Sequence, residues 1–172
     1  MCKIVLIGYM GVGKTTIAEL LADKLNVKWL DLDALLEKET QLSISMLFQQ
    51  KGEVYFRKLE HALFTKVMQS DESFVLSTGG GTPCYANNHL YLNGDAIYSI
   101  YLKASIPTLY SRLYSATVDR PLLAQKSEEE LLEAISKNLF DRAYYYNQAT
   151  YKIDVDDKLP TAVVEEIVAL LD

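Results

Sequence analysis

Short apolar runs alternate with longer amphipathic segments along this chain. The apolar runs have the length of buried strands and cover residues 3–7, 28–31, 74–77, 96–102 and 151–154. The longer segments repeat their apolar positions at helical spacing and cover residues 14–25, 33–39, 44–51, 53–69, 106–114, 128–143 and 161–171. Strands that are separated by helices predict an α/β fold whose parallel sheet is covered by helices on both faces.

The chain length and the absence of internal breaks predict one domain. A chain of 172 residues can bury a single hydrophobic core. No repeat, low-complexity tract or interdomain linker interrupts residues 1–172. We therefore expect a single domain, and we expect it to be a monomer.

Charge and cysteine content exclude several classes of protein. The net charge is −6, with 17 basic and 23 acidic residues, which argues against binding to nucleic acid or to an anionic membrane surface. Cys2 and Cys84 fit neither a disulfide framework nor a metal site. The apolar run near the start is too short for a signal-peptide core or a membrane span. We expect a cytoplasmic protein.

Residues 8–15, Gly-Tyr-Met-Gly-Val-Gly-Lys-Thr, match the phosphate-loop pattern GxxxxGK[ST]. The motif follows a predicted strand and opens a predicted helix, which is the context that supports it. Its glycines let backbone N–H groups surround phosphate oxygens, and the helix directs its positive end at the same group. Lys14 would reach the β- and γ-phosphates of ATP, and the Thr15 hydroxyl would bind Mg²⁺.

Two acidic residues follow the second predicted strand. Asp31 and Asp33 are two positions apart, so on a strand they would face the same side. The carboxyl ends of parallel strands line the ligand crevice. Asp31 would therefore support the metal, and Asp33 would contact a hydroxyl of the phosphate acceptor. Such pairs also often cap the next helix, but the phosphate loop favours the functional interpretation.

Two of the four arginines are candidates for binding an anion. Glu60 lies three residues after Arg57, where it would orient the guanidinium to grip a carboxylate with two hydrogen bonds. The alternative is a surface ion pair that adds little stability. Arg142 lies seven residues after Ile135, on nearly the same helix face, and a charge there needs a partner. That partner is an internal carboxylate or an anionic ligand.

Two further segments suit a ligand site. Gly79, Gly80 and Gly81 follow a core strand and leave the backbone bare for close approach, although a flexible turn is the alternative. Residues 112–126 lack a clear amphipathic period, and loops of this length are often lids. Such a lid would bring Arg120 to the transferring phosphate; otherwise the segment is an inert surface loop.

Taken together in this order and spacing, these motifs resemble the shikimate kinase family of P-loop proteins over nearly the whole chain. The motifs that carry the resemblance are residues 8–15, 31–33, 56–60, 79–81 and 119–123, and Arg142 with residues 144–146. The family usually has Pro-Leu-Tyr and an acidic residue after this arginine, whereas this chain has three tyrosines followed by Asn147 and Gln148. The resemblance implies a five-stranded parallel sheet in the order 2-3-1-4-5.

The resemblance also implies a reaction, its substrates and a set of residues. The γ-phosphoryl group of ATP would pass, with Mg²⁺, to the 3-hydroxyl of shikimate, on the route to chorismate and the aromatic amino acids. The implied catalytic residues are Lys14, Asp33 and Arg120, and the implied metal ligands are Thr15 and Asp31. ATP would contact Gly11, Val12, Gly13, Lys14, Thr15, Thr16, Arg112 and Arg120. Shikimate would contact Asp33, Phe56, Arg57, Gly79, Gly80, Gly81 and Arg142, from a binding segment at about 33–61.

Two other functions remain open from the sequence. A small-metabolite kinase of the same branch, such as a gluconate kinase, would share the phosphate loop but has no evident need for both Arg57 and Arg142. A nucleotide-binding module that has lost catalysis is the second alternative, and it would not be expected to retain so many of these residues.

Overall fold

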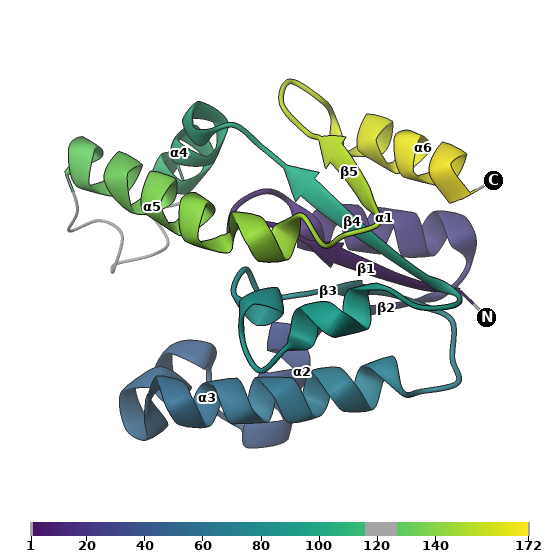
Figure 1. The fold of residues 1–172 in the computed structure, drawn as a ribbon, viewed down its shortest axis with the longest axis horizontal. Coiled ribbons are helices and arrows are strands. Elements are labelled where there is room, and N and C mark those ends of the chain that lie inside the picture. The colour runs from purple at the N-terminus through teal and green to yellow at the C-terminus, as the bar shows by residue number, and fades with distance from the viewer. Residues whose placement is uncertain (1, 116–126, 172) are drawn as a thin grey trace.

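A five-stranded parallel sheet forms the centre of the structure, a computed structural model that describes residues 2–115 and 127–171 (Figure 1). The strands are β1 (Lys3–Ile7), β2 (Lys28–Asp31), β3 (Phe74–Ser77), β4 (Ile97–Lys103) and β5 (Tyr151–Asp154). They lie in the order β2-β3-β1-β4-β5, and every neighbouring pair is parallel. The strand order and the α/β class expected from the sequence are confirmed.

The helices connect and cover these strands. They are α1 (Lys14–Leu25), α2 (Leu32–Thr40), α3 (Ile44–Met68), α4 (Ile106–Ser115), α5 (Glu128–Tyr146) and α6 (Pro160–Leu171). Two 3₁₀ segments, η1 (Thr82–Cys84) and η2 (Asn88–Leu92), follow β3 and were not predicted. No helix in the described part of the chain combines the length and the apolar content needed to cross a membrane.

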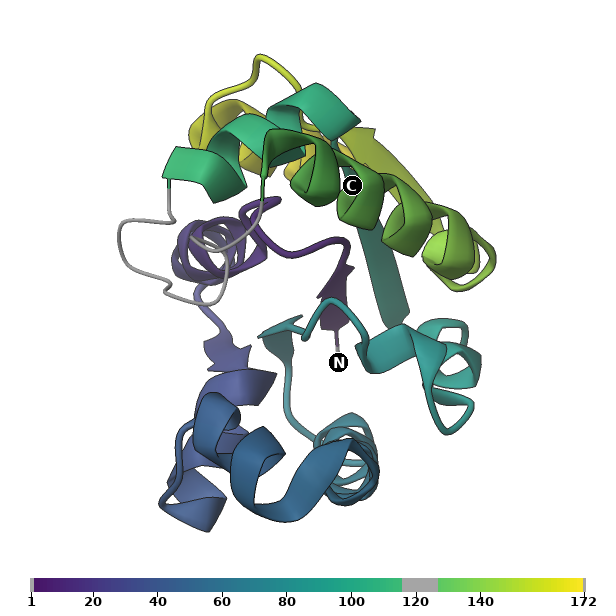
Figure 2. The ribbon, with the colours of Figure 1, turned by 90° about the vertical axis from the view of Figure 1, so that its left-hand side faces the viewer.

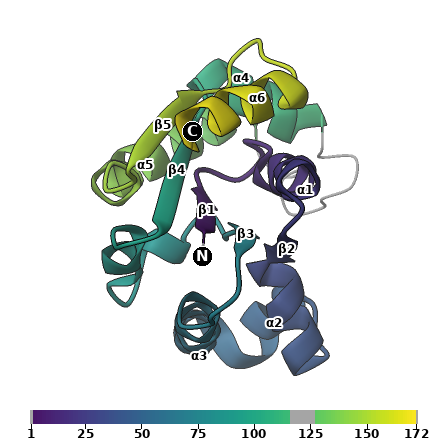
Figure 3. The ribbon, with the colours of Figure 1, turned by 90° about the vertical axis from the view of Figure 1, so that its right-hand side faces the viewer.

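Alternate residues of β1 supply the two halves of the core. Ile4 and Leu6 pack with apolar residues of α1, α4, α5 and α6 on one face of the sheet. Val5 and Ile7 pack on the other face with residues of α2 and α3. Figures 2 and 3 show this division, with α2 and α3 on the side of the sheet opposite α6. Burial on both faces explains why the inner strands β1 and β3 are almost continuously apolar.

Helix α3 changes direction at Gly52. This residue adopts φ 78° and ψ 168°, which is not helical, between two helical stretches. The sequence predicted the same break, as separate helices at 44–51 and 53–69. The second stretch carries Phe56 and Arg57, so the break separates the site-bearing part of α3 from its first turns.

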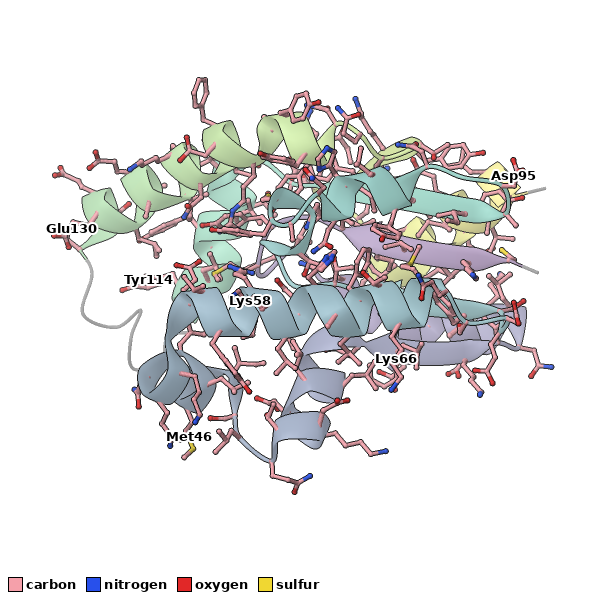
Figure 4. The ribbon with its side chains drawn as sticks, turned by 60° about the horizontal axis from the view of Figure 1, so that its bottom comes forward. Met46, Lys58, Lys66, Asp95, Tyr114 and Glu130 are labelled. Carbon is pink, nitrogen blue, oxygen red and sulfur yellow. The ribbon has the colours of Figure 1, made fainter. Side chains whose placement is uncertain are left out.

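The carboxyl ends of three neighbouring strands bring the motifs together. The phosphate loop follows β1, Asp31 ends β2, and Ser77 ends β3, which runs directly into the glycine turn. Figure 4 labels Tyr114, near the end of α4, and Glu130, near the start of α5, on the same side of the molecule as Lys58 of α3. The site lies at the strand-end crevice that α/β sheets commonly use.

Candidate active site

The phosphate loop has the backbone geometry of an anion site. Gly8, Gly11 and Gly13 have φ values of 147°, 78° and 103°, which side chains with a Cβ rarely adopt. Gly13 supplies no side-chain cap to α1, so the first N–H groups of that helix remain available to an anion. This arrangement matches the phosphate-binding role predicted for residues 8–15.

Lys14 lies folded over the same loop. Its Nζ donates to the carbonyl oxygens of Gly8 at 2.8 Å and Tyr9 at 2.9 Å. Burial lowers the pKa of Lys14 to about 8, although the nearby carboxylates of Asp33 and Asp31 act in the opposite direction. An ammonium group has three N–H donors, so one remains for a phosphate oxygen.

Arg112 approaches the loop from α4. Its Nη1 donates to the carbonyl oxygen of Val12 at 2.8 Å. The predicted nucleotide residue therefore lies directly on the phosphate loop. Arg120, the predicted lid arginine, lies outside the described residues, as does most of the predicted lid at 112–126.

Three oxygen groups lie close together beside the loop. The Thr15 hydroxyl donates to Asp31 Oδ2 at 3.0 Å and lies 3.4 Å from Ser77 Oγ. The other Asp31 oxygen accepts from the backbone N–H of Ala34 at 3.1 Å and so caps α2. Capping and metal support are thus compatible at Asp31. Hydroxyl and carboxylate oxygens are suitable ligands for Mg²⁺, which usually takes few ligands from the protein. Among the described residues, no group of three or more His, Cys, Asp or Glu side chains could hold a metal ion.

Asp33 faces the site from a different element than predicted. It does not follow Asp31 along a strand, because β2 ends at Asp31 and Asp33 belongs to the first turn of α2. The prediction of a shared strand face was therefore wrong, although Asp33 still reaches the glycine turn, where its Oδ1 is 3.4 Å from the place a Cβ on Gly79 would occupy. Burial, together with the charges of Asp31 and Glu60, raises the pKa of Asp33 to about 6.

Arg57 and Glu60 form the ion pair that the sequence predicted. Arg57 Nη1 donates to Glu60 Oε2 at 2.9 Å. Glu60 is only 1% exposed, and its other oxygen accepts from the Thr82 hydroxyl at 2.7 Å. The alternative of an exposed surface pair is wrong, because the Glu60 carboxylate is buried and each of its oxygens accepts a hydrogen bond.

Arg142 has aromatic neighbours in place of a carboxylate. Its guanidinium carbon lies 5.4 Å from the centre of the Tyr9 ring. Tyr9 is itself held by Asn138, whose Nδ2 donates to the phenol oxygen at 3.1 Å. Among the described residues, no carboxylate forms an ion pair with Arg142. The structure thus favours the anionic-ligand interpretation of this arginine over an internal salt bridge.

Consecutive glycines bring the two arginines to one place. A Cβ on Gly80 would lie 3.4 Å from an Arg142 nitrogen, and a Cβ on Gly81 would lie 2.8 Å from an Arg57 nitrogen. The Tyr146 hydroxyl donates to the Gly80 carbonyl at 2.6 Å and fixes the turn to α5. The bare backbone is therefore occupied by guanidinium groups, which explains why side chains are excluded there.

Several contributors to the site were not assigned a role from the sequence. Ser77 lies beside Thr15, and Tyr9 lies near the Arg142 guanidinium. Tyr146 donates to the glycine turn, and Tyr85 lies against Arg57. Phe56, which the family resemblance implies as a shikimate contact, is 3% exposed, and the centre of its ring lies 5.1 Å from the Arg57 guanidinium carbon. Tyr146 lies four residues after Arg142 on α5, a spacing that places both on one helix face. Only spatial proximity links Tyr9 to Arg142 and Tyr85 to Arg57.

Comparisons with known proteins agree with this geometry. The family model described as shikimate kinase matches residues 10–172. A curated shikimate kinase from Flavobacterium johnsoniae is 53% identical over 169 residues, covering 98% of both chains. A crystal structure of shikimate kinase from Bacteroides thetaiotaomicron superposes with a TM-score of 0.90 at 35% identity, covering 99% of this chain and 98% of that one. The structure of shikimate kinase from Acinetobacter baumannii in complex with shikimate superposes with a TM-score of 0.86 at 30% identity. The match covers 99% of this chain and 93% of that one. This chain belongs to the shikimate kinase family.

Proposed function

We propose that this chain transfers the γ-phosphoryl group of ATP to the 3-hydroxyl of shikimate, forming shikimate 3-phosphate and ADP for aromatic amino acid biosynthesis. The observation that carries the proposal is the convergence of Arg57 and Arg142 on Gly80 and Gly81, next to the phosphate loop. A small acid is held there by two cations while its hydroxyl faces the triphosphate. The complex of the Acinetobacter baumannii relative with shikimate supports the choice of acid.

Arg57 has donors left for the carboxylate. A guanidinium carries five N–H donors. One is directed at Glu60 at 2.9 Å and one at Glu53 at 3.4 Å, which leaves three. Two parallel bonds to a carboxylate fit this remainder, and Arg142 adds a second cation. The acid is gripped at one end, so its ring hydroxyls have a fixed direction.

Asp33 binds the acceptor hydroxyl. Its ionised oxygen accepts the hydroxyl hydrogen bond and takes the proton as the oxygen–phosphorus bond forms. A pKa of about 6 leaves Asp33 largely ionised at neutral pH, yet closer to a useful base than an ordinary aspartate. Phosphoryl transfer depends mainly on positioning and charge neutralisation, so orienting the hydroxyl is the larger part of this role.

The triphosphate is neutralised by the loop and its cation. Lys14 and the N–H groups of residues 11–16 bind phosphate oxygens. Thr15 and Asp31 would hold Mg²⁺, with Ser77 beside them; when bound, the ion offsets the negative charge of the phosphates. Arg112 lies on the nucleotide side of the loop, and Arg120 is assigned to the transition state from the sequence alone.

The remaining assignments follow from the sequence and belong to the same proposal. The chain acts as one domain and as a monomer, with ATP and shikimate as its partners. Cys2 and Cys84 are free thiols in the structure, which supports a cytoplasmic location.

A coupled ADP-release assay tests the proposal. The purified chain is given ATP, Mg²⁺ and, in turn, shikimate, quinate, gluconate or a nucleoside monophosphate. Shikimate should give the highest kcat/KM, and chelation of the metal should abolish turnover. A preference for gluconate, or no turnover with any acid, would overturn the assignment.

A further inference from the structure

We propose that Tyr85 is a positioning residue that sets the plane of the Arg57 guanidinium and thereby the strength of its grip on the substrate carboxylate. This inference rests on the proposed function. The guanidinium carbon of Arg57 lies 4.0 Å from the centre of the Tyr85 ring, closer than the 5.1 Å to Phe56. Guanidinium groups stack favourably on aromatic faces at such distances.

The contact with the Tyr85 ring restrains the plane of the Arg57 guanidinium, which the ion pair with Glu60 alone does not. The hydrogen bond from Nη1 to Glu60 fixes one nitrogen but still allows the guanidinium to pivot about that bond. The second carboxylate, Glu53, is 54% exposed and reaches Nε only at 3.4 Å, so it restrains the pivot weakly. A flat ring against the guanidinium fixes the plane. Bidentate binding of a carboxylate depends on that plane.

Tyr85 is held by the same network that holds Glu60. The Thr82 hydroxyl donates to Glu60, and Asn88 Nδ2 donates to the Thr82 carbonyl at 2.9 Å. The Asn88 N–H donates to the Tyr85 carbonyl at 2.9 Å. Thr82 and Asn88 are 0% and 1% exposed. The loop bearing Tyr85 is therefore fixed relative to the carboxylate that orients Arg57.

The left-handed backbone after Tyr85 supports this arrangement. Ala86 and Asn87 have φ values of 50° and 58°, an uncommon conformation for residues with a side chain. The two residues turn the chain so that Asn88 becomes buried. His61 completes the loop anchor, since its Nδ1 lies 2.6 Å from Asn88 Oδ1.

The Tyr85 ring also shields one face of the Arg57 guanidinium from water. Arg57 and Tyr85 line an open groove of about 470 Å³ between α3 and the loop, together with Lys58 and His61. Figure 4 shows Lys58 on this part of α3. Because the groove admits water, loss of the ring would hydrate one face of the guanidinium and weaken its attraction for a carboxylate. The Tyr85 hydroxyl has no hydrogen-bond partner among the described residues, so the ring alone carries the proposed role.

Steady-state kinetics with Tyr85→Leu and Tyr85→Phe test the inference. Tyr85→Leu keeps an apolar side chain but removes the π face, and should raise the KM for shikimate by about twofold to fivefold at unchanged kcat and unchanged KM for ATP. Tyr85→Phe should behave like the original chain. Tyr55→Leu, which alters another exposed tyrosine of the same region, is the matched control and should have no effect.

A double-mutant cycle on kcat/KM shows whether Tyr85 acts through Arg57. Arg57→Lys keeps the charge but has no plane to orient, so Tyr85→Leu should cost little in that background. Thermal unfolding of each variant accompanies the kinetics. The inference would be overturned if Tyr85→Leu lowered kcat/KM equally with Arg57 and with Lys at position 57. It would also be overturned if Tyr85→Leu left the KM for shikimate unchanged, or if it lowered kcat and the thermal midpoint together. If the original chain does not phosphorylate shikimate, the proposed function itself fails, whereas shikimate turnover with a silent Tyr85→Leu removes only this inference.

Discussion

Arg57 donates a 2.9 Å hydrogen bond to Glu60, a carboxylate that is 1% exposed. Burying such a pair is not by itself strongly stabilising, but removing one partner leaves an uncompensated charge. Glu60 also accepts from Thr82, which directly follows the glycine turn. The same carboxylate therefore fixes both the arginine and the backbone against which the acid is proposed to bind.

Replacing this carboxylate by an amide should weaken shikimate binding. Glu60→Gln keeps the shape but loses the charge, so Arg57 is held less firmly, and we expect the KM for shikimate to rise about tenfold. The free energy of unfolding should fall by about 1–3 kcal/mol. Steady-state kinetics and urea unfolding measure the two effects. Glu53→Gln is the matched control, because Glu53 is exposed and 3.4 Å from Arg57; an equal effect in both variants would contradict the special role of Glu60.

Substitutions of Arg57 and Arg142 should affect the KM for shikimate, whereas a substitution of Arg112 should affect the KM for ATP. Arg57→Ala and Arg142→Ala each remove one of the two cations proposed to hold the substrate carboxylate, and each should raise the KM for shikimate at least about tenfold. Arg112→Ala should instead raise the KM for ATP, since Arg112 contacts Val12 of the phosphate loop. Initial rates with each substrate varied in turn separate the effects, and a raised KM for ATP in Arg142→Ala alone would reassign that residue.

Lys14 should be essential for turnover. Lys14→Met removes the buried ammonium group at the phosphate loop, and we expect kcat to fall by roughly a hundredfold or more. Lys24→Met is a suitable control on the same helix, because Lys24 forms a surface pair with Glu165. Single-turnover measurements give the rate of transfer. Near-normal transfer in Lys14→Met would discard the role of the phosphate loop in this chain.

Asp33 should make stability depend on pH. Its pKa is raised, so the folded chain binds a proton more tightly than the unfolded chain. Protonation therefore favours folding, and stability falls as the pH rises from about 4 to about 6. Asp33→Asn removes this charge and should increase the free energy of unfolding by about 2 kcal/mol at pH 7, with little difference below pH 4.

Urea unfolding of both forms between pH 4 and pH 8 measures the Asp33 effect. The same substitution should lower kcat, because the amide cannot take the hydroxyl proton. A difference in stability that stays constant across this pH range would show that Asp33 is not the group responsible.

Features that are local in sequence were predicted well, and features that depend on packing were not. The phosphate loop and the Arg57–Glu60 pair each lie within a few residues, so spacing alone indicates their contacts. The Tyr9–Arg142 and Tyr85–Arg57 contacts join segments that only the folded sheet brings together. A tyrosine is also common in an ordinary hydrophobic core, so its position in the sequence does not indicate that its ring contacts a guanidinium group.

Asp33 lies near the predicted site although the element predicted to carry it was wrong. The alternation expected of a strand placed Asp31 and Asp33 on one side, but Asp31 accepts from Ala34 and ends the strand by capping α2. Capping starts the helix one residue earlier than the periodicity indicated. Asp33 still faces the site because the first turn of α2 lies at the carboxyl end of the sheet.

The most direct measurement is a crystal structure of this chain with ADP, Mg²⁺ and shikimate bound together. The account predicts both guanidiniums, of Arg57 and Arg142, within hydrogen-bond distance of the shikimate carboxylate, and the 3-hydroxyl directed at Asp33 and the phosphate loop. A carboxylate bound away from the backbone of Gly80 and Gly81, with either guanidinium turned to solvent, would contradict it.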